Sequence, residues 1–233
     1  NVVFISGSSK GIGRAIAKRF LEENALVTIT GRNAEDVQET YSTLANDFTS
    51  DQLFLFIGDL TKDDVIHEAI AATVNKWGRL DHTVANIGTG HAQTGWNIGD
   101  SEWQRMINQN FFSAVRLIES AVPHMLKSNK PSISMIGSIA GIENLGAPIP
   151  YSSAKAALTA YTKSLANELG PKGIRANIIA PGNIFFPGGT WDIKLAKNKT
   201  GVTNYINAEV PLGRFGKPEE IADLVVFLSS QRA

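Results

Sequence analysis

The chain has 233 residues, of which 43% are hydrophobic and 19% charged, so it can bury a large core and lies outside the composition range of disordered proteins. Lys plus Arg and Asp plus Glu number 22 each, so no net charge favours nucleic acid or an anionic membrane as a partner. The chain contains no cysteine, which excludes disulfides, thiolate metal sites and a cysteine nucleophile.

Six short runs rich in β-branched and aromatic residues predict strands over residues 2–6, 26–30, 53–57, 82–86, 132–137 and 175–180. These runs are apolar throughout instead of alternating between apolar and polar residues. Continuous apolar strands are typical of parallel sheets in which helices cover both faces.

Apolar residues at helical spacing predict helices between these strands. The helices are expected near 12–20, up to Trp77, from Ser101 to about Met125, from Tyr151 to Leu169, and from Pro218 onward. Thr61, with Asp64 three positions on, resembles a capping box that opens the helix ending at Trp77. The alternation of strands and helices predicts a single α/β domain over residues 1–233, with a doubly wound parallel sheet flanked by helices in three layers.

A glycine-rich stretch, "SGSSKGIG" over residues 6–13, follows the first strand and opens the first helix. Its glycines stand at positions 7, 11 and 13. Glycines in this context let backbone N–H groups approach a pyrophosphate at the positive end of the helix dipole. By itself the stretch also fits a tight turn that binds no ligand.

A second stretch, "YSSAK" over residues 151–155, places Tyr151 and Lys155 one turn apart on one helix face. A free phenol has a pKa of about 10, and a nearby positive charge lowers it. The pair therefore fits a tuned proton donor, although the two residues alone also fit a surface pair.

Several motifs in order resemble those of the short-chain dehydrogenase/reductase family. The glycine turn resembles the family's T-G-x-x-x-G-x-G turn, with Ser6 in place of the usual Thr. It is followed by "GDL" (58–60), "ANIG" (85–88), "WQRMINQN" (103–110), "IGSIAG" (136–141), "YSSAK" and "APG" (180–182). Ala85 and Ile87 depart from the family's N-N-A-G segment.

The resemblance implies a Rossmann-type catalytic domain with the catalytic tetrad Asn110, Ser138, Tyr151 and Lys155. In it, Tyr151 exchanges a proton with the substrate, Ser138 hydrogen-bonds the substrate oxygen, and Asn110 holds a water molecule. Lys155 lowers the pKa of Tyr151 and binds the nicotinamide ribose. The implied cofactor-binding residues are Gly7, Ser9, Lys10, Gly11, Ile12, Gly13, Arg32, Asp59, Leu60, Asn86, Gly88, Tyr151, Lys155, Pro181, Gly182 and Ile184.

The end of the second strand favours NADP as the cofactor, with NAD as the alternative. Dinucleotide folds that prefer NAD usually place a carboxylate there to bind the ribose 2′-OH. Here Gly31 stands at that place, followed by Arg32, and Lys10 adds a second positive charge inside the glycine turn. A guanidinium can bind the 2′-phosphate through two hydrogen bonds.

The expected activity is that of an NADP-dependent carbonyl reductase of the 3-oxoacyl-reductase-like branch, which interconverts a small-molecule ketone and a secondary alcohol. Residues 183–210, too long for a simple connection, are expected to form a substrate lid. The resemblance also implies a homodimer or homotetramer. Two alternatives remain open: an NAD-dependent sugar or secondary-alcohol dehydrogenase, and a catalytically silent nucleotide-binding protein of the same fold.

Other partners and sites are not expected. No apolar run approaches the roughly 18 residues of a membrane helix, and the four histidines lack the spacing of metal ligands. We therefore expect no membrane, no nucleic acid and no metal. The lack of cysteine is compatible with the cytoplasm, which is the expected location.

Overall fold

The computed structural model describes residues 1–233 and contains one sheet of six parallel strands. The strands are β1 (Val2–Ile5), β2 (Leu26–Gly31), β3 (Leu53–Ile57), β4 (His82–Ala85), β5 (Ser132–Ile136) and β6 (Arg175–Ile179). Their order is β3-β2-β1-β4-β5-β6, which many dinucleotide-binding sheets share. Every strand starts at the predicted residue and ends within one residue of the predicted end, so the doubly wound parallel sheet is confirmed.

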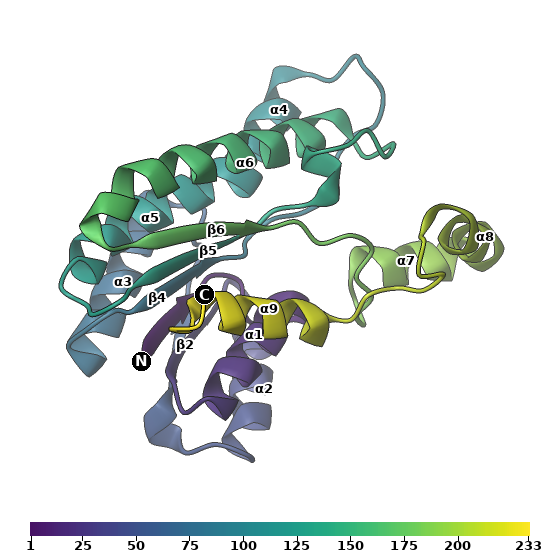
Figure 1. Cartoon of the computed structure of the whole chain (residues 1–233). Coiled ribbons are helices and arrows are strands. Elements are labelled where there is room, and N and C mark those ends of the chain that lie inside the picture. The colour runs from purple at the N-terminus through teal and green to yellow at the C-terminus, as the bar shows by residue number, and fades with distance from the viewer.

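Helices follow the strands and cover both faces of the sheet. They are α1 (Gly11–Glu22), α2 (Ala34–Ala45), α3 (Asp63–Trp77), α4 (Asp100–Ile107), α5 (Ser113–Met125), α6 (Ile149–Leu169), α7 (Thr190–Lys197), α8 (Lys199–Glu209) and α9 (Pro218–Ser229). Figure 1 shows α3, α5 and α6 over one face and α1, α2 and α9 over the other. The three predicted layers are therefore present. None of the helices combines the length and apolar composition that a membrane span needs.

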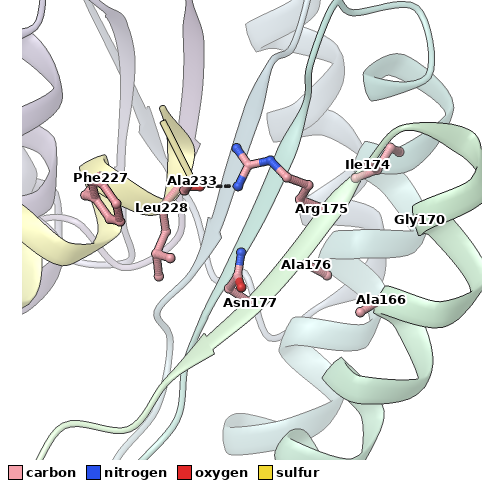
Figure 2. Close-up of a pocket in the computed structure, with 9 residues that line it drawn as sticks. All are labelled: Ala166, Gly170, Ile174, Arg175, Ala176, Asn177, Phe227, Leu228 and Ala233. Atoms are coloured by element: carbon pink, nitrogen blue, oxygen red, sulfur yellow. Dashed lines mark hydrogen bonds between the residues drawn. The ribbon is translucent and has the colours of Figure 1, made fainter. Parts of the chain in front are cut away.

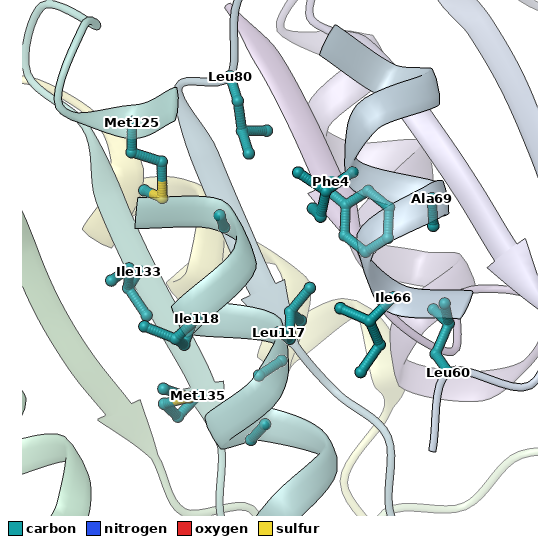
Figure 3. Packing of buried hydrophobic residues seen from close by; sticks show 14 of the residues in the cluster. Phe4, Leu60, Ile66, Ala69, Leu80, Leu117, Ile118, Met125, Ile133 and Met135 are labelled. Atoms are coloured by element: carbon teal, nitrogen blue, oxygen red, sulfur yellow. The ribbon is translucent and has the colours of Figure 1, made fainter. Parts of the chain in front are cut away.

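The continuous apolar strands are explained by two separate cores. Along β1, Val2 and Phe4 belong to the cluster beneath α3 and α5, which Figure 3 shows from close by. Val3 and Ile5 point to the opposite face and pack with residues of α1, α2 and α9. Alternate strand residues face opposite sides of a sheet. Both sides are buried here, so both sets must be apolar.

The start of α3 differs from the prediction. This helix begins at Asp63 with Lys62 as the N-cap, and no side chain caps it. The hydroxyl of Thr61 instead donates to the Asp59 carboxylate at 2.8 Å, and the Thr61 N–H donates to the same oxygen at 3.1 Å. The predicted capping box is wrong because a nearer carboxylate already accepts from both Thr61 donors.

A groove runs along the outer edge of β6, between the end of α6 and the end of α9 (Figure 2). Arg175, at the start of β6, donates to the backbone oxygens of Leu228 and Ser230 and so ties this edge strand to α9. The groove lies toward the amino end of β6. Ligands of open parallel sheets bind at the carboxyl ends of the strands, so the candidate site lies at the other end.

Candidate active site

The glycine turn between β1 and α1 is fastened to the end of β2 by two buried hydroxyl groups. The Gly7 N–H donates to Thr30 Oγ1 at 2.9 Å, and the Thr30 N–H donates to Ser8 Oγ at 2.8 Å. The hydroxyls of Ser8 and Thr30 both donate to the Ile5 carbonyl oxygen. Sequence reasoning missed Ser8 and Thr30, because only the folded sheet brings the two strand ends side by side.

Glycine is required in this turn for two different reasons. Gly7 and Gly11 adopt the left-handed region, with φ of 67° and 52°, which other residues rarely enter. A Cβ at Gly13 would lie only 2.6 Å from Nδ2 of Asn86, whose amide donates to the Gly7 carbonyl oxygen at 2.8 Å. The turn is therefore a close-fitting backbone cradle at the N-terminus of α1, which suits a pyrophosphate.

Several predicted cofactor residues are held by specific local contacts. The Ser9 carbonyl oxygen accepts a 2.7 Å hydrogen bond from Thr40 of α2, and Ile12 packs against the core on that face. On the other side Leu60 is buried, and Asp59 is held by its bonds to Thr61. Ser9 and Ile12 belong to the turn between β1 and α1, and Asp59 and Leu60 follow β3 at the same carboxyl edge of the sheet.

The basic residues beside β2 differ in their surroundings. Arg32 is exposed, whereas Lys10 pairs with Asp36 of α2 at 2.9 Å, although the Lys10 side chain stays 57% exposed. Gly31 is enclosed, since a Cβ there would lie 2.7 Å from Val37 and 2.9 Å from Ser9 Oγ. An acidic residue at position 31 would therefore displace the neighbouring turn as well as change the charge.

Tyr151 and Ser138 meet at the carboxyl end of β5. Tyr151 is the third residue of α6, and Ser138 is the N-cap of the 3₁₀ turn at Ile139–Gly141, where its Oγ accepts from the Ala140 N–H at 3.2 Å. The Ser138 hydroxyl lies close to the Tyr151 hydroxyl. Burial raises the pKa of Tyr151, and the nearby Ser138 hydroxyl opposes this shift without cancelling it.

Lys155 lies one turn further along α6 and is buried. Its Nζ donates to the Ile136 carbonyl oxygen, at the end of β5, at 2.8 Å. Burial lowers the pKa of Lys155 to about 8. Burial of Tyr151 acts on its pKa in the direction opposite to the one expected from Lys155.

Asn110 is buried in a π-helical turn, Asn108–Phe112, that joins α4 to α5. Such turns often mark functional sites because they redirect side chains. The Asn110 Oδ1 accepts from the Thr89 N–H at 2.8 Å, and its Nδ2 donates to the Met106 carbonyl oxygen at 3.0 Å. A Cβ at Gly88 would lie 2.8 Å from Asn110 Oδ1 and 3.1 Å from Lys155 Nζ, so both side chains border Gly88.

The segment after β6 completes this edge. The carbonyl oxygen of buried Pro181 accepts from the Ile139 N–H at 3.1 Å, and Gly182 lies next to the Ile139 side chain. Ile184 pairs with Gly216 in an isolated parallel bridge. The structure thus brings Asn110, Ser138, Tyr151 and Lys155 together beside the glycine turn and the Pro181–Gly182 segment.

A doubly wound sheet with this turn and this set of side chains defines the class of Rossmann-type oxidoreductases. A protein-family model described as enoyl-(acyl carrier protein) reductase matches residues 7–233. The 3-oxoacyl-[acyl-carrier-protein] reductase FabG of Chlamydia trachomatis serovar D is 33% identical over 97% of this chain and 88% of the relative.

Solved structures agree with this match. A short-chain dehydrogenase/reductase of unknown function from Caenorhabditis elegans, with cofactor, has a TM-score of 0.91 and 30% identity, over 98% of this chain and 88% of that chain. A short chain oxidoreductase from Pseudomonas aeruginosa PAO1, with NADPH bound and an atypical catalytic center, has a TM-score of 0.92 and 27% identity, over 99% and 90% of the two chains. The chain belongs to the short-chain dehydrogenase/reductase family and resembles its 3-oxoacyl reductases.

Proposed function

We propose that this protein reduces a ketone to a secondary alcohol with NADPH and that Tyr151 is the general acid. The observation that carries the proposal is that Tyr151, at the start of α6, and Ser138, at the end of β5, lie close together beside buried Lys155. The FabG relative is named as a 3-oxoacyl reductase and the Pseudomonas structure holds NADPH, which supports the same reaction class and cofactor. A panel of ketones assayed by NADPH absorbance tests it, and no turnover of any ketone would favour a silent nucleotide-binding protein.

In this mechanism NADPH supplies the hydride that reduces the carbonyl carbon. Ser138 donates a hydrogen bond to the carbonyl oxygen and holds it next to the Tyr151 hydroxyl. Tyr151 then transfers its proton to that oxygen as negative charge develops there. Because burial raises its pKa, Tyr151 carries the required proton at neutral pH. Lys155 supplies positive charge close by, and Asn110 and Gly88 border that ammonium group.

The full set of predicted cofactor residues is kept as part of the proposal. The backbone from Gly7 to Gly13 would hold the pyrophosphate, and Asp59 with Leu60 would contact the adenine. Asn86, Gly88, Pro181, Gly182 and Ile184 would line the path to the nicotinamide. The fit is supported by the glycine turn, where a Cβ at position 13 would clash with the Gly7 carbonyl oxygen and with Asn86.

We expect NADPH to be preferred over NADH by about 10- to 1,000-fold in kcat/KM, since charge-assisted contacts are worth up to about 3 kcal/mol each and exposure reduces this. Arg32→Ala should lower the preference. Asp36→Ala should raise it, because it releases Lys10 from its 2.9 Å ion pair. The measurement is kcat/KM for both cofactors at two salt concentrations. Equal use of both cofactors by the wild type would show that Lys10 and Arg32 do not bind the phosphate.

The lid assignment for residues 183–210 is also proposed. The segment contains α7 and α8, which lie beyond the carboxyl end of β6 and away from the two cores (Figure 1). We expect amide hydrogens over 187–210 to exchange fastest among the helices without ligands and to slow when cofactor and substrate bind. Hydrogen exchange in both states measures this, and equally strong protection in both would contradict the lid. Location in the cytoplasm and assembly into a homodimer or homotetramer stay predictions.

A further inference from the structure

One side chain from the segment after β6 contacts the glycine turn directly. The ring of Phe186 points at Gly11, because a Cβ added to Gly11 would lie 2.6 to 2.8 Å from three atoms at the tip of this ring. A Cβ added to Gly189 would lie 2.9 to 3.0 Å from the same ring. Phe186 therefore sits between two glycines, one that opens α1 and one that is the N-cap of α7.

The space taken by the ring is part of the proposed cofactor cradle. Gly11 is the first residue of α1, where free backbone N–H groups and the helix dipole favour a phosphate. The missing side chain of such a glycine usually lets a pyrophosphate approach the backbone. In this structure the room at Gly11 is filled by an apolar ring that offers no hydrogen bond to a phosphate. Ring and pyrophosphate compete for the same side of the turn.

We propose that Phe186 is a gate residue for the cofactor. Its ring covers Gly11 when the glycine turn is free and must leave before a dinucleotide can bind there. The inference rests on the proposed function, since it concerns access of NADPH to that site. The free energy needed to displace this ring therefore weakens the apparent affinity for the cofactor.

The chain on either side of Phe186 is anchored by backbone hydrogen bonds. Just before it, the strand-like pairing of Asn183 and Phe185 with Gly216 holds the segment in place through hydrogen bonds of 2.9 and 3.0 Å. Just after it, Gly188 adopts φ of 74°, and its N–H donates to Asp192 of α7 at 2.8 Å. A turn of the chain between Phe185 and Gly188 would move the ring off Gly11 and, through the Gly188–Asp192 hydrogen bond, would move the start of α7 with it.

An aromatic cluster makes α7 and α8 follow that movement together. Trp191 of α7 stacks on Tyr205 of α8 with ring centroids 5.5 Å apart, and it also contacts Phe215. Gly213, with φ of 59°, lies just before Phe215 and is a second position at which the backbone can turn. Cofactor binding would thus reposition the whole proposed lid through one ring, before any substrate arrives.

The test compares Phe186→Ala with Phe185→Ala. Phe185 is the adjacent phenylalanine, and it packs against Phe215 at 5.7 Å. Phe186→Ala should bind NADPH about three- to tenfold more tightly than the wild type and associate faster, because no ring has to leave. Phe185→Ala should not bind more tightly. Phe186→Leu, which keeps apolar bulk, should fall between the wild type and Phe186→Ala. Dissociation constants come from fluorescence titration, association rates from stopped flow, and folding of each variant from circular dichroism.

The direction in which the NADPH affinity changes separates the possible outcomes. Weaker NADPH binding by Phe186→Ala and Phe186→Leu would overturn the gate, since it would mean that the ring packs on the bound cofactor. Unchanged affinity and association rate would overturn it as well. A wild-type protein that binds neither NADPH nor NADH would overturn the proposed function itself, which makes the two failures distinguishable.

Discussion

We expect Tyr151→Phe to lower kcat for ketone reduction by at least about 100-fold and to leave the NADPH dissociation constant unchanged. The substitution keeps the ring and its packing but removes the proton that general acid catalysis transfers, and such catalysis contributes at least about 100-fold. Steady-state kinetics and cofactor titration measure the two quantities separately.

The matched control is Tyr161→Phe on the same helix. Tyr161 stacks edge-on against Phe111, and burial raises its pKa to about 12, so it shares the aromatic and buried character of Tyr151. It lies away from Ser138 along α6 and should retain near-native kcat. Near-native kcat in Tyr151→Phe would remove Tyr151 from the mechanism, while an equal loss in both variants would point to damage to α6.

Lys155→Ala is expected to impair two steps at once. Its ammonium group is proposed both to place positive charge near Tyr151 and to bind the nicotinamide ribose. We expect kcat to fall about 100-fold and the NADPH dissociation constant to rise about tenfold, in line with the loss of a charged hydrogen bond. Lys163→Ala, an exposed lysine on the same helix, is the control. A loss of kcat without a change in cofactor affinity would show that the ribose contact is wrong.

The pH dependence of the wild type should identify the same lysine. Burial lowers the Lys155 pKa to about 8, so the group is mainly protonated at pH 7 and loses its charge as the pH rises through about 8. We therefore expect kcat/KM for ketone reduction to fall over that range, since kcat/KM follows groups of the free enzyme. The fall near pH 8 should be absent in Lys155→Ala. A fall that persists in this variant would assign it to another group.

Short windows of the sequence are enough to predict much of this architecture. Side chains of successive strand residues point to opposite faces, so the unbroken apolar run of Val2 to Ile5 is enough to predict a strand buried on both sides. The spacing of Tyr151 and Lys155 likewise follows from the period of one helix. Strand ends, the fold class and these residue types could therefore be predicted from short windows of sequence.

Helices without a clear apolar stripe were harder to predict. In α2 only Val37, Thr40 and Leu44 are buried, and α7 buries no residue completely. The α7–α8 pair depends on contacts between its own aromatic residues and Phe215, which follows α8 in the chain. Helices are predicted from apolar residues at helical spacing. Where a helix does not pack against the main core, this spacing is weak and the helix is harder to predict.

Only the tertiary structure decided how the predicted residues act on one another. Tyr151 and Lys155 share a helix face, yet Lys155 donates to Ile136 on β5, and burial raises the Tyr151 pKa against the expected direction. Lys10 pairs with Asp36 on a different helix. The hydration, partners and competitors of a side chain depend on segments that are distant in the sequence and meet only on folding. The local sequence establishes which chemical groups are present and on which elements they stand. The packing of distant segments shifts the pKa values of Tyr151 and Lys155, and it places Phe186 on the turn where the cofactor is proposed to bind.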